Sequence, residues 1–151
     1  MKQNEIRLVP MEEAHVSQIA QIEILCFSSP WNEDSVRSEL TNPLSLWLVA
    51  LDGERVVGYV GSQSVLGEAD LMNIAVLPAY RRQRIALRLL DELQKALHAQ
   101  GVCSITLEVR ASNDAAIRLY EFLGYIQVGR RPNYYFKPKE DALILRKEWS
   151  L

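Results

Sequence analysis

Four arginines gather where an apolar segment gives way to an amphipathic one. Arg81, Arg82, Arg84 and Arg88 lie within the stretch AYRRQRIALRLL of residues 79–90, over about two helical turns. The stretch follows the apolar run of residues 72–77, which is predicted to be a buried strand closed by proline. Free backbone N–H groups and the helix dipole at such a junction favour a bound anion, such as the phosphates of a cofactor. A solvated basic face is the alternative interpretation.

Glu108 is a candidate general base. In ITLEVR, residues 105–110, the aliphatic side chains share one face of a predicted strand, and Thr106, Glu108 and Arg110 share the other. If helices cover both faces of the sheet, the carboxylate is partly buried, and burial raises a carboxyl pKa towards the range of a general base. The alternative is a solvated face with a minor contact between glutamate and arginine.

Two aromatic features could also take part in chemistry. Tyr120 follows Ala116 by four residues and Ile117 by three, so its ring can simply belong to the core. Its hydroxyl could equally protonate a thiolate leaving group. Residues 130–139 are predicted to be a polar loop, in which RRPNYYF forms a binding lip. The other interpretation is that these aromatic rings fold back and seal the sheet edge.

Composition narrows the functional class. The 151 residues are predicted to form one domain, with 48% hydrophobic and 24% charged residues. A net charge of −2 argues against nucleic acid as the main partner and leaves room for a small anionic cofactor or a basic peptide. No signal peptide or transmembrane span is expected, and a reducing cytoplasm is the default location. His15 and His98 lack metal-ligand spacing, and no nucleotide-binding glycine motif is present.

Hydrophobic periodicity and turn signals predict the elements that must position these residues. The expected strands cover residues 5–9, 46–51, 55–61, a segment ending at Pro78, 103–109, 125–129 and 142–145. The expected helices cover residues 11–27, a segment capped by Asn32 and ending before Pro43, 82–100 and 113–123. This order predicts an α/β fold with a mixed sheet and helices on its faces.

Taken together, these features resemble the GNAT family of acetyl-CoA-dependent N-acetyltransferases over nearly the whole chain. The resemblance is carried by SSPWNEDS, MNIAVLPAYRRQ, LEVRASNDAAIRLYEFLGY, RRPNYY and EDALIL. It is strongest to the members that acetylate the N-terminal alanine of a small-subunit ribosomal protein. The resemblance implies a single domain over residues 1–151, with a mostly antiparallel central sheet flanked by helices on both faces.

The resemblance also implies a cofactor site. In the family's loop pattern Q/R-x-x-G-x-G/A, Arg81 takes the first place and Ala86 the last, and Arg84 stands where the family usually has glycine. We expect an ordinary helical conformation at Arg84, with its side chain pointing outward; a positive φ there would cost about 1 kcal/mol. The cofactor-binding residues implied are the loop's neighbours Arg82, Gln83, Ile85 and Leu87 through backbone N–H groups, Ile74, Ala75 and Val76 through the main chain at a splayed strand end, and Asn113.

The roles of the remaining residues follow from the same resemblance. Glu108 would be the general base, acting through water, and Tyr120 the general acid. Asn133, Tyr134 and Tyr135 would line the peptide entrance. The implied cosubstrate is acetyl-CoA without a metal, and the implied partner is the N-terminus of a ribosomal protein or a similar basic peptide. No direct contact with nucleic acid or membrane is expected, and the protein is expected to be a monomer or a weak homodimer.

Two other functions remain open at this stage. One is acetylation of a different amine, such as a polyamine, and the other is a non-catalytic module that binds acyl-CoA. A carboxylate is a weak base, which favours a peptide α-ammonium, with a pKa of about 8, over a lysine, with a pKa of about 10.4. The presence of both Glu108 and Tyr120 argues against a module without catalysis, because binding alone requires neither.

Overall fold

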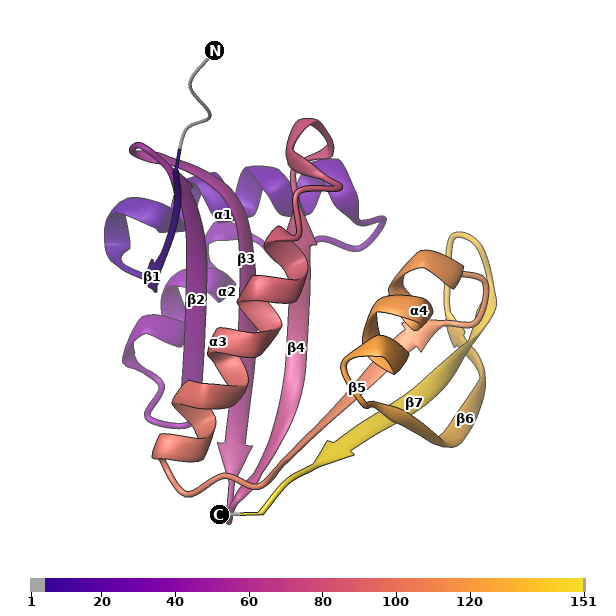
Figure 1. Ribbon diagram of the computed structural model, residues 1–151. Helices are drawn as coiled ribbons and strands as arrows, with labels where there is room; N and C mark the ends of the chain where they lie inside the picture. The colour runs from indigo at the N-terminus through magenta and orange to yellow at the C-terminus, as the bar shows by residue number, and fades with distance from the viewer. Residues whose placement is uncertain (1–4, 151) are drawn as a thin grey trace.

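A computed structural model describes residues 5–150 of the chain (Figure 1). One seven-stranded sheet has the strand order β1-β2-β3-β4-β5-β7-β6. The strands are β1 (Ile6–Pro10), β2 (Ser45–Asp52), β3 (Arg55–Val65), β4 (Glu68–Val76), β5 (Ser104–Arg110), β6 (Ile126–Tyr135) and β7 (Glu140–Glu148). The helices are α1 (Glu13–Cys26), α2 (Glu33–Ser38), α3 (Ile85–Ala99) and α4 (Asp114–Phe122), with short 3₁₀ turns at Glu39–Thr41 and Pro78–Tyr80.

Helices cover both faces of this sheet. In Figure 1, α1 and α2 lie behind β2, β3 and β4, α3 crosses in front of these strands, and α4 lies beside the C-terminal strands. All neighbouring strands pair antiparallel except β4 and β5, which pair parallel. The mixed, mostly antiparallel sheet with helices on both faces is therefore confirmed, and so is the order of the elements.

Helix α3 shows most clearly why the sequence folds as predicted. The residues of its expected inner stripe, Ile85, Leu89, Leu90, Leu93 and Leu97, are all buried. Their spacing places them on one side of the helix, and burial of such a stripe supplies most of a helix's stability in a protein. The helix begins at Ile85, three residues later than expected, because the loop before it is not helical.

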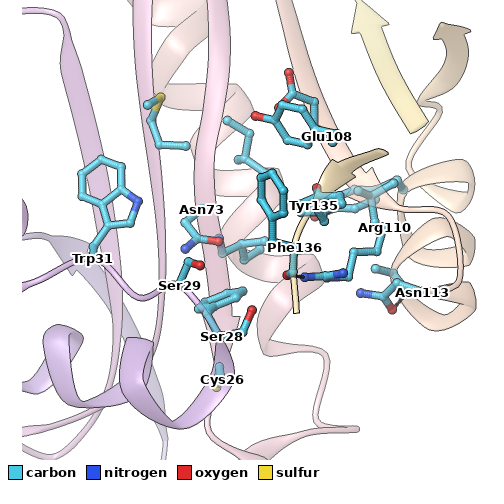
Figure 2. A pocket seen from close by; sticks show the side chains of 18 residues that line it. Cys26, Ser28, Ser29, Trp31, Asn73, Glu108, Arg110, Asn113, Tyr135 and Phe136 are labelled. Atoms are coloured by element: carbon cyan, nitrogen blue, oxygen red, sulfur yellow. Dashed lines mark hydrogen bonds between the residues drawn. The ribbon is translucent and has the colours of Figure 1, made fainter. Parts of the chain in front are cut away.

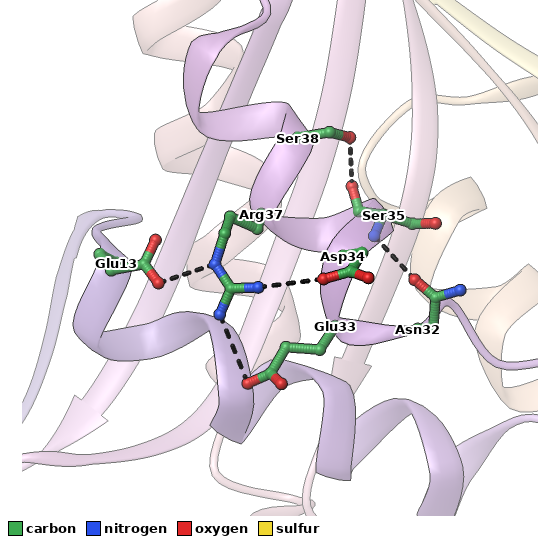
Figure 3. A network of polar contacts seen from close by, with 7 residues as sticks. All are labelled: Glu13, Asn32, Glu33, Asp34, Ser35, Arg37 and Ser38. Carbon is green, nitrogen blue, oxygen red and sulfur yellow. Dashed lines mark hydrogen bonds and ion pairs between the residues drawn. The ribbon is translucent and has the colours of Figure 1, made fainter.

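Helix α2 is fixed to α1 by polar contacts (Figure 3). Asn32 caps α2 as predicted, because its side-chain oxygen accepts a hydrogen bond of 2.8 Å from the Ser35 N–H. The Arg37 guanidinium on α2 pairs with Glu13 at the start of α1 at 2.8 Å, and it also pairs with Glu33 and Asp34 of its own helix. These contacts fix α2 against the start of α1, and the segment of residues 27–32 that connects the two helices contributes residues to the cavity described below.

The sheet divides between β4 and β5. Their parallel register covers only Glu68–Asp70 on β4 and Ser104–Thr106 on β5. Beyond these residues the two strands diverge, and Figure 1 shows β5 running away from β4 with α4, β6 and β7 beside it. The splayed strand end that the family resemblance implies is therefore present.

The prediction of a polar loop over residues 130–139 is wrong for residues 130–135, and only residues 136–139 form a turn. Strand β6 continues to Tyr135 and pairs with β7, with Arg131 opposite Ala142 and Tyr135 opposite Glu140. The register shifts between Arg131 and Tyr135, which leaves Pro132 outside the ladder. A proline in a strand occurs at an edge or an irregularity because it has no N–H to donate, and here its presence hid the strand in the sequence.

Gly61 provides a test of how tightly the core packs around Trp47. A Cβ atom at Gly61 on β3 would overlap the ring of Trp47, which is held between Trp31 at 5.4 Å and Tyr59 at 5.8 Å between ring centroids. We expect Gly61→Ala to lower the free energy of unfolding by about 1–3 kcal/mol, as overpacking does in well-filled cores. Chemical denaturation measures the free energy of unfolding of each variant. In a Trp47→Leu background the same substitution should cost much less, and an equal cost in both backgrounds would contradict the clash.

Candidate active site

A cavity of about 740 Å³ opens where β4 and β5 diverge. Its walls come from two parts of the chain that face each other in Figure 2. One wall holds residues from the end of α1, the segment that follows it and β4, namely Cys26, Phe27, Ser28, Ser29, Trp31, Leu71, Met72, Asn73 and Ile74. The other holds residues from β5, α4 and the β6–β7 hairpin, namely Glu108, Val109, Arg110, Asn113, Ala116, Tyr120, Tyr134, Tyr135 and Phe136.

The main chain of β4 presents polar groups to this gap, on the side away from β3; of these, the Ile74 N–H and the Val76 carbonyl are bonded by the side chains of Asn73 and Arg81. Leu77 donates its N–H to the Val57 carbonyl at 2.8 Å, and Ala75 lies opposite Tyr59 on β3. Because hydrogen-bonded and non-hydrogen-bonded pairs alternate in an antiparallel ladder, the main-chain groups of Ala75 point to β3. Those of Ile74 and Val76 point away from β3, towards the gap. Of the three residues predicted to contact the cofactor through their main chain, Ile74 and Val76 therefore face the open side of β4, and Ala75 does not.

The loop before α3 has a left-handed backbone. Arg84 has φ 61° and ψ 22°, and Arg82 has φ 67°. The expectation of an ordinary helical conformation at Arg84 is therefore wrong, and the family's glycine position keeps a glycine-like backbone with an arginine in it. The loop has to turn sharply from the strand into the helix, and this turn requires the positive φ at a cost of about 1 kcal/mol.

The first turn of α3 leaves its donors free. The first bond within the helix runs from the Arg88 N–H to the Arg84 carbonyl at 3.0 Å, and no side chain caps the helix. Within residues 5–150, no hydrogen bond engages the N–H groups of Ile85, Ala86 and Leu87. Such free amides at a helix N-terminus are where an anion binds. These residues lie outside the cavity lining, next to the end of β4.

The four arginines do not act as one cluster. Arg81 donates its Nε to the Val76 carbonyl at 3.1 Å, which ties the loop to the end of β4. Arg88 points elsewhere, because its guanidinium donates to the Ile6 carbonyl on β1 at 3.0 Å. Arg82 and Arg84 are exposed at the helix N-terminus. The four arginines therefore do not form one uniformly solvated basic face, because Arg81 and Arg88 are bonded to two different strands.

Glu108 lies among the residues of the lip. Its carboxylate is 3.4 Å from the Arg131 guanidinium, and its side chain is 31% exposed. A hydrogen bond with Glu108 raises the pKa of the Tyr134 hydroxyl, while burial raises the pKa of Tyr135 to about 12. The structure thus brings together two features that are far apart in the sequence, the candidate base and the predicted peptide entrance.

Tyr120 lies on α4, and Asn113 is the residue that caps this helix. The Tyr120 ring is 5% exposed and meets Tyr125 edge-on at 5.5 Å, yet it also lines the cavity. Burial raises the pKa of the Tyr120 hydroxyl, so it is protonated at neutral pH. Asn113 caps α4, since its side-chain oxygen accepts from the Ala116 N–H at 3.2 Å, and it lines the cavity as well.

Asn133 is placed differently from the two tyrosines that follow it. Its N–H donates to the Asp141 carboxylate at 2.8 Å, and its φ is 54°. It lies outside the cavity lining, whereas Tyr134 and Tyr135 are part of it. The turn at Asn133 aims these two rings at the cavity, so the asparagine shapes the lip from the outside.

Arg110 is a cavity residue to which the sequence analysis assigned no role. Its guanidinium donates to the carbonyls of Phe136 at 3.1 Å and Pro138 at 2.9 Å, and it stacks over the Tyr135 ring at 4.4 Å. These contacts hold the lip against β5. Its place two residues after Glu108, on the same face of the strand, is the signal that could have pointed to it.

Glu23 is the second residue that was missed. It is 1% exposed, and its carboxylate accepts hydrogen bonds from the Trp31 N–H at 2.8 Å, from Asn73 Nδ2 at 2.7 Å and from the Tyr59 hydroxyl. Burial raises the pKa of Glu23 to about 7. A charged residue on the buried stripe of α1 was the available signal. A strongly perturbed carboxyl beside a cavity is typical of functional sites.

The left-handed backbone at Arg84 can be tested by two substitutions that both remove the guanidinium. We expect Arg84→Gly to be more stable than Arg84→Ala by about 0.5 kcal/mol or more, because only glycine adopts this φ without strain. The greater chain entropy of glycine in the unfolded state offsets part of the difference. Urea denaturation of the two variants measures it. Equal stabilities would mean that residue 84 is not held at positive φ.

Two further observations concern metal binding and membrane insertion. Among residues 5–150, no group of three or more His, Cys, Asp or Glu side chains could hold a metal ion. The helices found in the same part of the chain are all too short or too polar to cross a membrane.

Comparison with known proteins identifies relatives over most of the chain. Residues 16–125 match the acetyltransferase (GNAT) family. The [ribosomal protein bS18]-alanine N-acetyltransferase of Escherichia coli strain K12 is 37% identical over 137 residues, which cover 89% of this chain and 92% of that protein. Its counterpart in Salmonella typhimurium is 41% identical over 128 residues, covering 83% and 85%.

Solved structures agree with this relationship. The crystal structure of the Escherichia coli ribosomal-protein-S18-alanine N-acetyltransferase matches with a TM-score of 0.89 at 35% identity, covering 97% of this chain and 96% of that one. Arabidopsis thaliana NAA60 in complex with acetyl-CoA shares the fold, with a TM-score of 0.87 at 20% identity, covering 95% and 98%. The chain therefore belongs to the acetyltransferase (GNAT) family.

Proposed function

We propose that this chain transfers the acetyl group of acetyl-CoA to the N-terminal α-amine of a protein, and that its acceptor is the alanine N-terminus of ribosomal protein bS18. The observation that carries the proposal is the cavity at the β4–β5 splay, which Glu108 and Tyr120 line together. The bS18-alanine acetyltransferases named above support this choice of acceptor, since they are similar over most of the chain.

The residues present fit acetyl-CoA. The free amides of Ile85, Ala86 and Leu87, together with the exposed Arg82 and Arg84, provide hydrogen-bond donors and positive charge for the pyrophosphate. In this proposal Gln83 donates its N–H beside them, and Arg81 contributes by holding the loop to β4. The main-chain groups of Ile74 and Val76 offer partners for the pantetheine and the acetyl carbonyl, and Asn113 lies across the gap from them.

Glu108 would accept the proton of the acceptor ammonium, directly or through water. At pH 7, deprotonation of an α-ammonium with a pKa of about 8 costs about 1.4 kcal/mol, whereas a lysine with a pKa of about 10.4 costs about 4.6 kcal/mol. A carboxylate is a weak base, so it is better suited to deprotonating the α-ammonium than the lysine. The neutral amine then attacks the thioester carbon, the C–N bond forms and the C–S bond breaks. The nitrogen gives up its second proton, which ends on the departing sulfur, so that the products are the amide and the free thiol of CoA. A main-chain N–H on the open side of β4 stabilises the developing oxyanion.

Tyr120 would act on the departing sulfur. Because burial raises the pKa of its hydroxyl, Tyr120 is protonated throughout the neutral range and is a donor at all times. Its ordinary pKa of about 10 already exceeds that of a thiol, about 8.5, so complete proton transfer to a free thiolate is uphill. Tyr120 therefore stabilises the leaving group by donating a hydrogen bond as the C–S bond breaks.

Intact-mass measurement tests the proposed reaction. The protein and acetyl-CoA are incubated with an alanine-starting basic peptide that contains lysine, beside the same peptide with a blocked N-terminus and beside a polyamine. We expect one acetyl group to be added to the free α-amine and none to the other two substrates. Transfer to the polyamine alone would replace the proposed acceptor class, and transfer to the blocked peptide would identify lysine as the acceptor.

Substitution of Glu108 tests its role as the base. Glu108→Gln should lower kcat by roughly 100-fold, the lower range for general acid–base catalysis, and should leave the dissociation constant of acetyl-CoA within about twofold. Steady-state kinetics and calorimetric titration measure the two quantities. Glu121→Gln, an exposed position on α4 outside the cavity, is the matched control. Normal turnover of Glu108→Gln would remove the assignment.

Substitution of Tyr120 tests the hydroxyl separately from the ring. Tyr120→Phe keeps the packing against Tyr125 and should lower kcat by roughly 10- to 100-fold, because only the hydrogen bond to the sulfur is lost. Tyr125→Phe is the control, since Tyr125 is equally buried but lies outside the cavity lining. If both variants retain the original rate, Tyr120 serves only in packing.

A further inference from the structure

We propose that Glu23 is a positioning residue whose carboxylate holds Trp31 and Asn73, and with them one wall of the cavity, in the arrangement that acetyl transfer requires. The kinetic part of this inference rests on the proposed function. The structural part, that one buried carboxylate fixes two separate segments of the wall, stands on the contacts described below.

The three partners of Glu23 come from three different elements. Oε1 accepts from the Trp31 N–H at 2.8 Å, in the segment between α1 and α2. Oε2 accepts from Asn73 Nδ2 on β4 at 2.7 Å and from the Tyr59 hydroxyl on β3. Trp31 and Asn73 both line the cavity, whereas Glu23 does not. Figure 2 shows Trp31, Ser29 and Asn73 together on the same side of the cavity.

All three partners donate, and this pattern requires an acceptor at both oxygens. Above its pKa of about 7, the Glu23 carboxylate is ionised and acceptor-only, whereas a glutamine side chain has an NH₂ group that would face a donor at every pH. Stability alone does not call for such a group, because a buried charge loses its hydration and an apolar side chain of similar size often stabilises a fold as well or better. The carboxylate therefore supplies directional contacts that leucine or methionine could not.

Asn73 extends the effect of Glu23 to the main chain. Its Nδ2 donates to Glu23, and its Oδ1 accepts from the Ile74 N–H at 3.1 Å. The Ile74 N–H is one of the β4 groups on the open side of the strand. A single amide thus connects the buried carboxylate to the strand end where the acetyl group is proposed to lie. The Trp31 contact does the same for the segment of residues 27–32.

Glu39 offers a matched control within the same chain. It is also a buried carboxylate, 6% exposed, and it also accepts from three side chains: Asn42 at 3.2 Å, Ser45 at 3.0 Å and Gln63 at 2.7 Å. None of these residues lines the cavity. A purely structural role for a buried glutamate should therefore give the same result at both positions.

The kinetic experiment compares Glu23→Gln with Glu39→Gln. We expect Glu23→Gln to lower kcat/KM for the acceptor peptide roughly 10- to 100-fold, the effect of losing a hydrogen bond to a charged group, while Glu39→Gln stays within about twofold. Asn73→Ala should cause a loss similar to that of Glu23→Gln, and the double variant should be no worse than the worse single one. Equal effects at Glu23 and Glu39, or additive losses at Glu23 and Asn73, would overturn the proposal.

Hydrogen exchange separates this inference from the proposed function. In Glu23→Gln we expect faster exchange at the Trp31 and Ile74 amides, and in Glu39→Gln we expect no change at either. Unchanged exchange in Glu23→Gln would show that the carboxylate does not hold these segments, whatever the activity. If the unaltered protein acetylates no peptide, the proposed function fails and the kinetic role of Glu23 falls with it, while the exchange data still decide whether Glu23 holds the wall.

Discussion

The early end of the parallel pairing between β4 and β5 is the constraint on which the site depends. A continuous sheet would use every main-chain donor and acceptor of β4 in a ladder. Because pairing covers only Glu68–Asp70 and Ser104–Thr106, the outward groups of Ile74 and Val76 are not used by a neighbouring strand, and a cavity forms beside them. The Ile74 carbonyl and the Val76 N–H remain available, while side chains bond the other two groups. The same divergence carries β5 away from α3, so that the helix N-terminus with its free amides stands next to the open strand.

The two walls of this cavity are fixed by different means. On the C-terminal side, Arg110 holds the lip to β5 through two main-chain carbonyls and the Tyr135 ring, and Arg131 pairs with Glu108. On the N-terminal side, Arg37 ties α2 to α1 at the surface while Glu23 gathers donors in the interior. Arginine suits the first task because its planar fork spans two acceptors, and a carboxylate suits the second because it only accepts.

Two unusual local features of the chain lie beside this site. The left-handed Arg84 precedes the free amides of α3, and the buried Glu23 lies behind the cavity wall. Each costs folding free energy, one through backbone strain and the other through lost hydration. Proteins tolerate such costs where function needs the geometry, and the surrounding contacts hold both residues in place.

Local pattern by itself determined the element order, the inner stripe of α3, the cap at Asn32 and the family, with Glu108 and Tyr120 as candidates, because periodicity, capping and motif spacing act over a few residues. Only the tertiary structure decided that Arg84 is left-handed, that β6 reaches Tyr135, and that Arg110 grips the lip. It alone revealed the role of Glu23, whose partners lie 8, 36 and 50 residues away. Such contacts arise when distant segments pack together, and no local sequence pattern records which donors will surround a buried carboxylate.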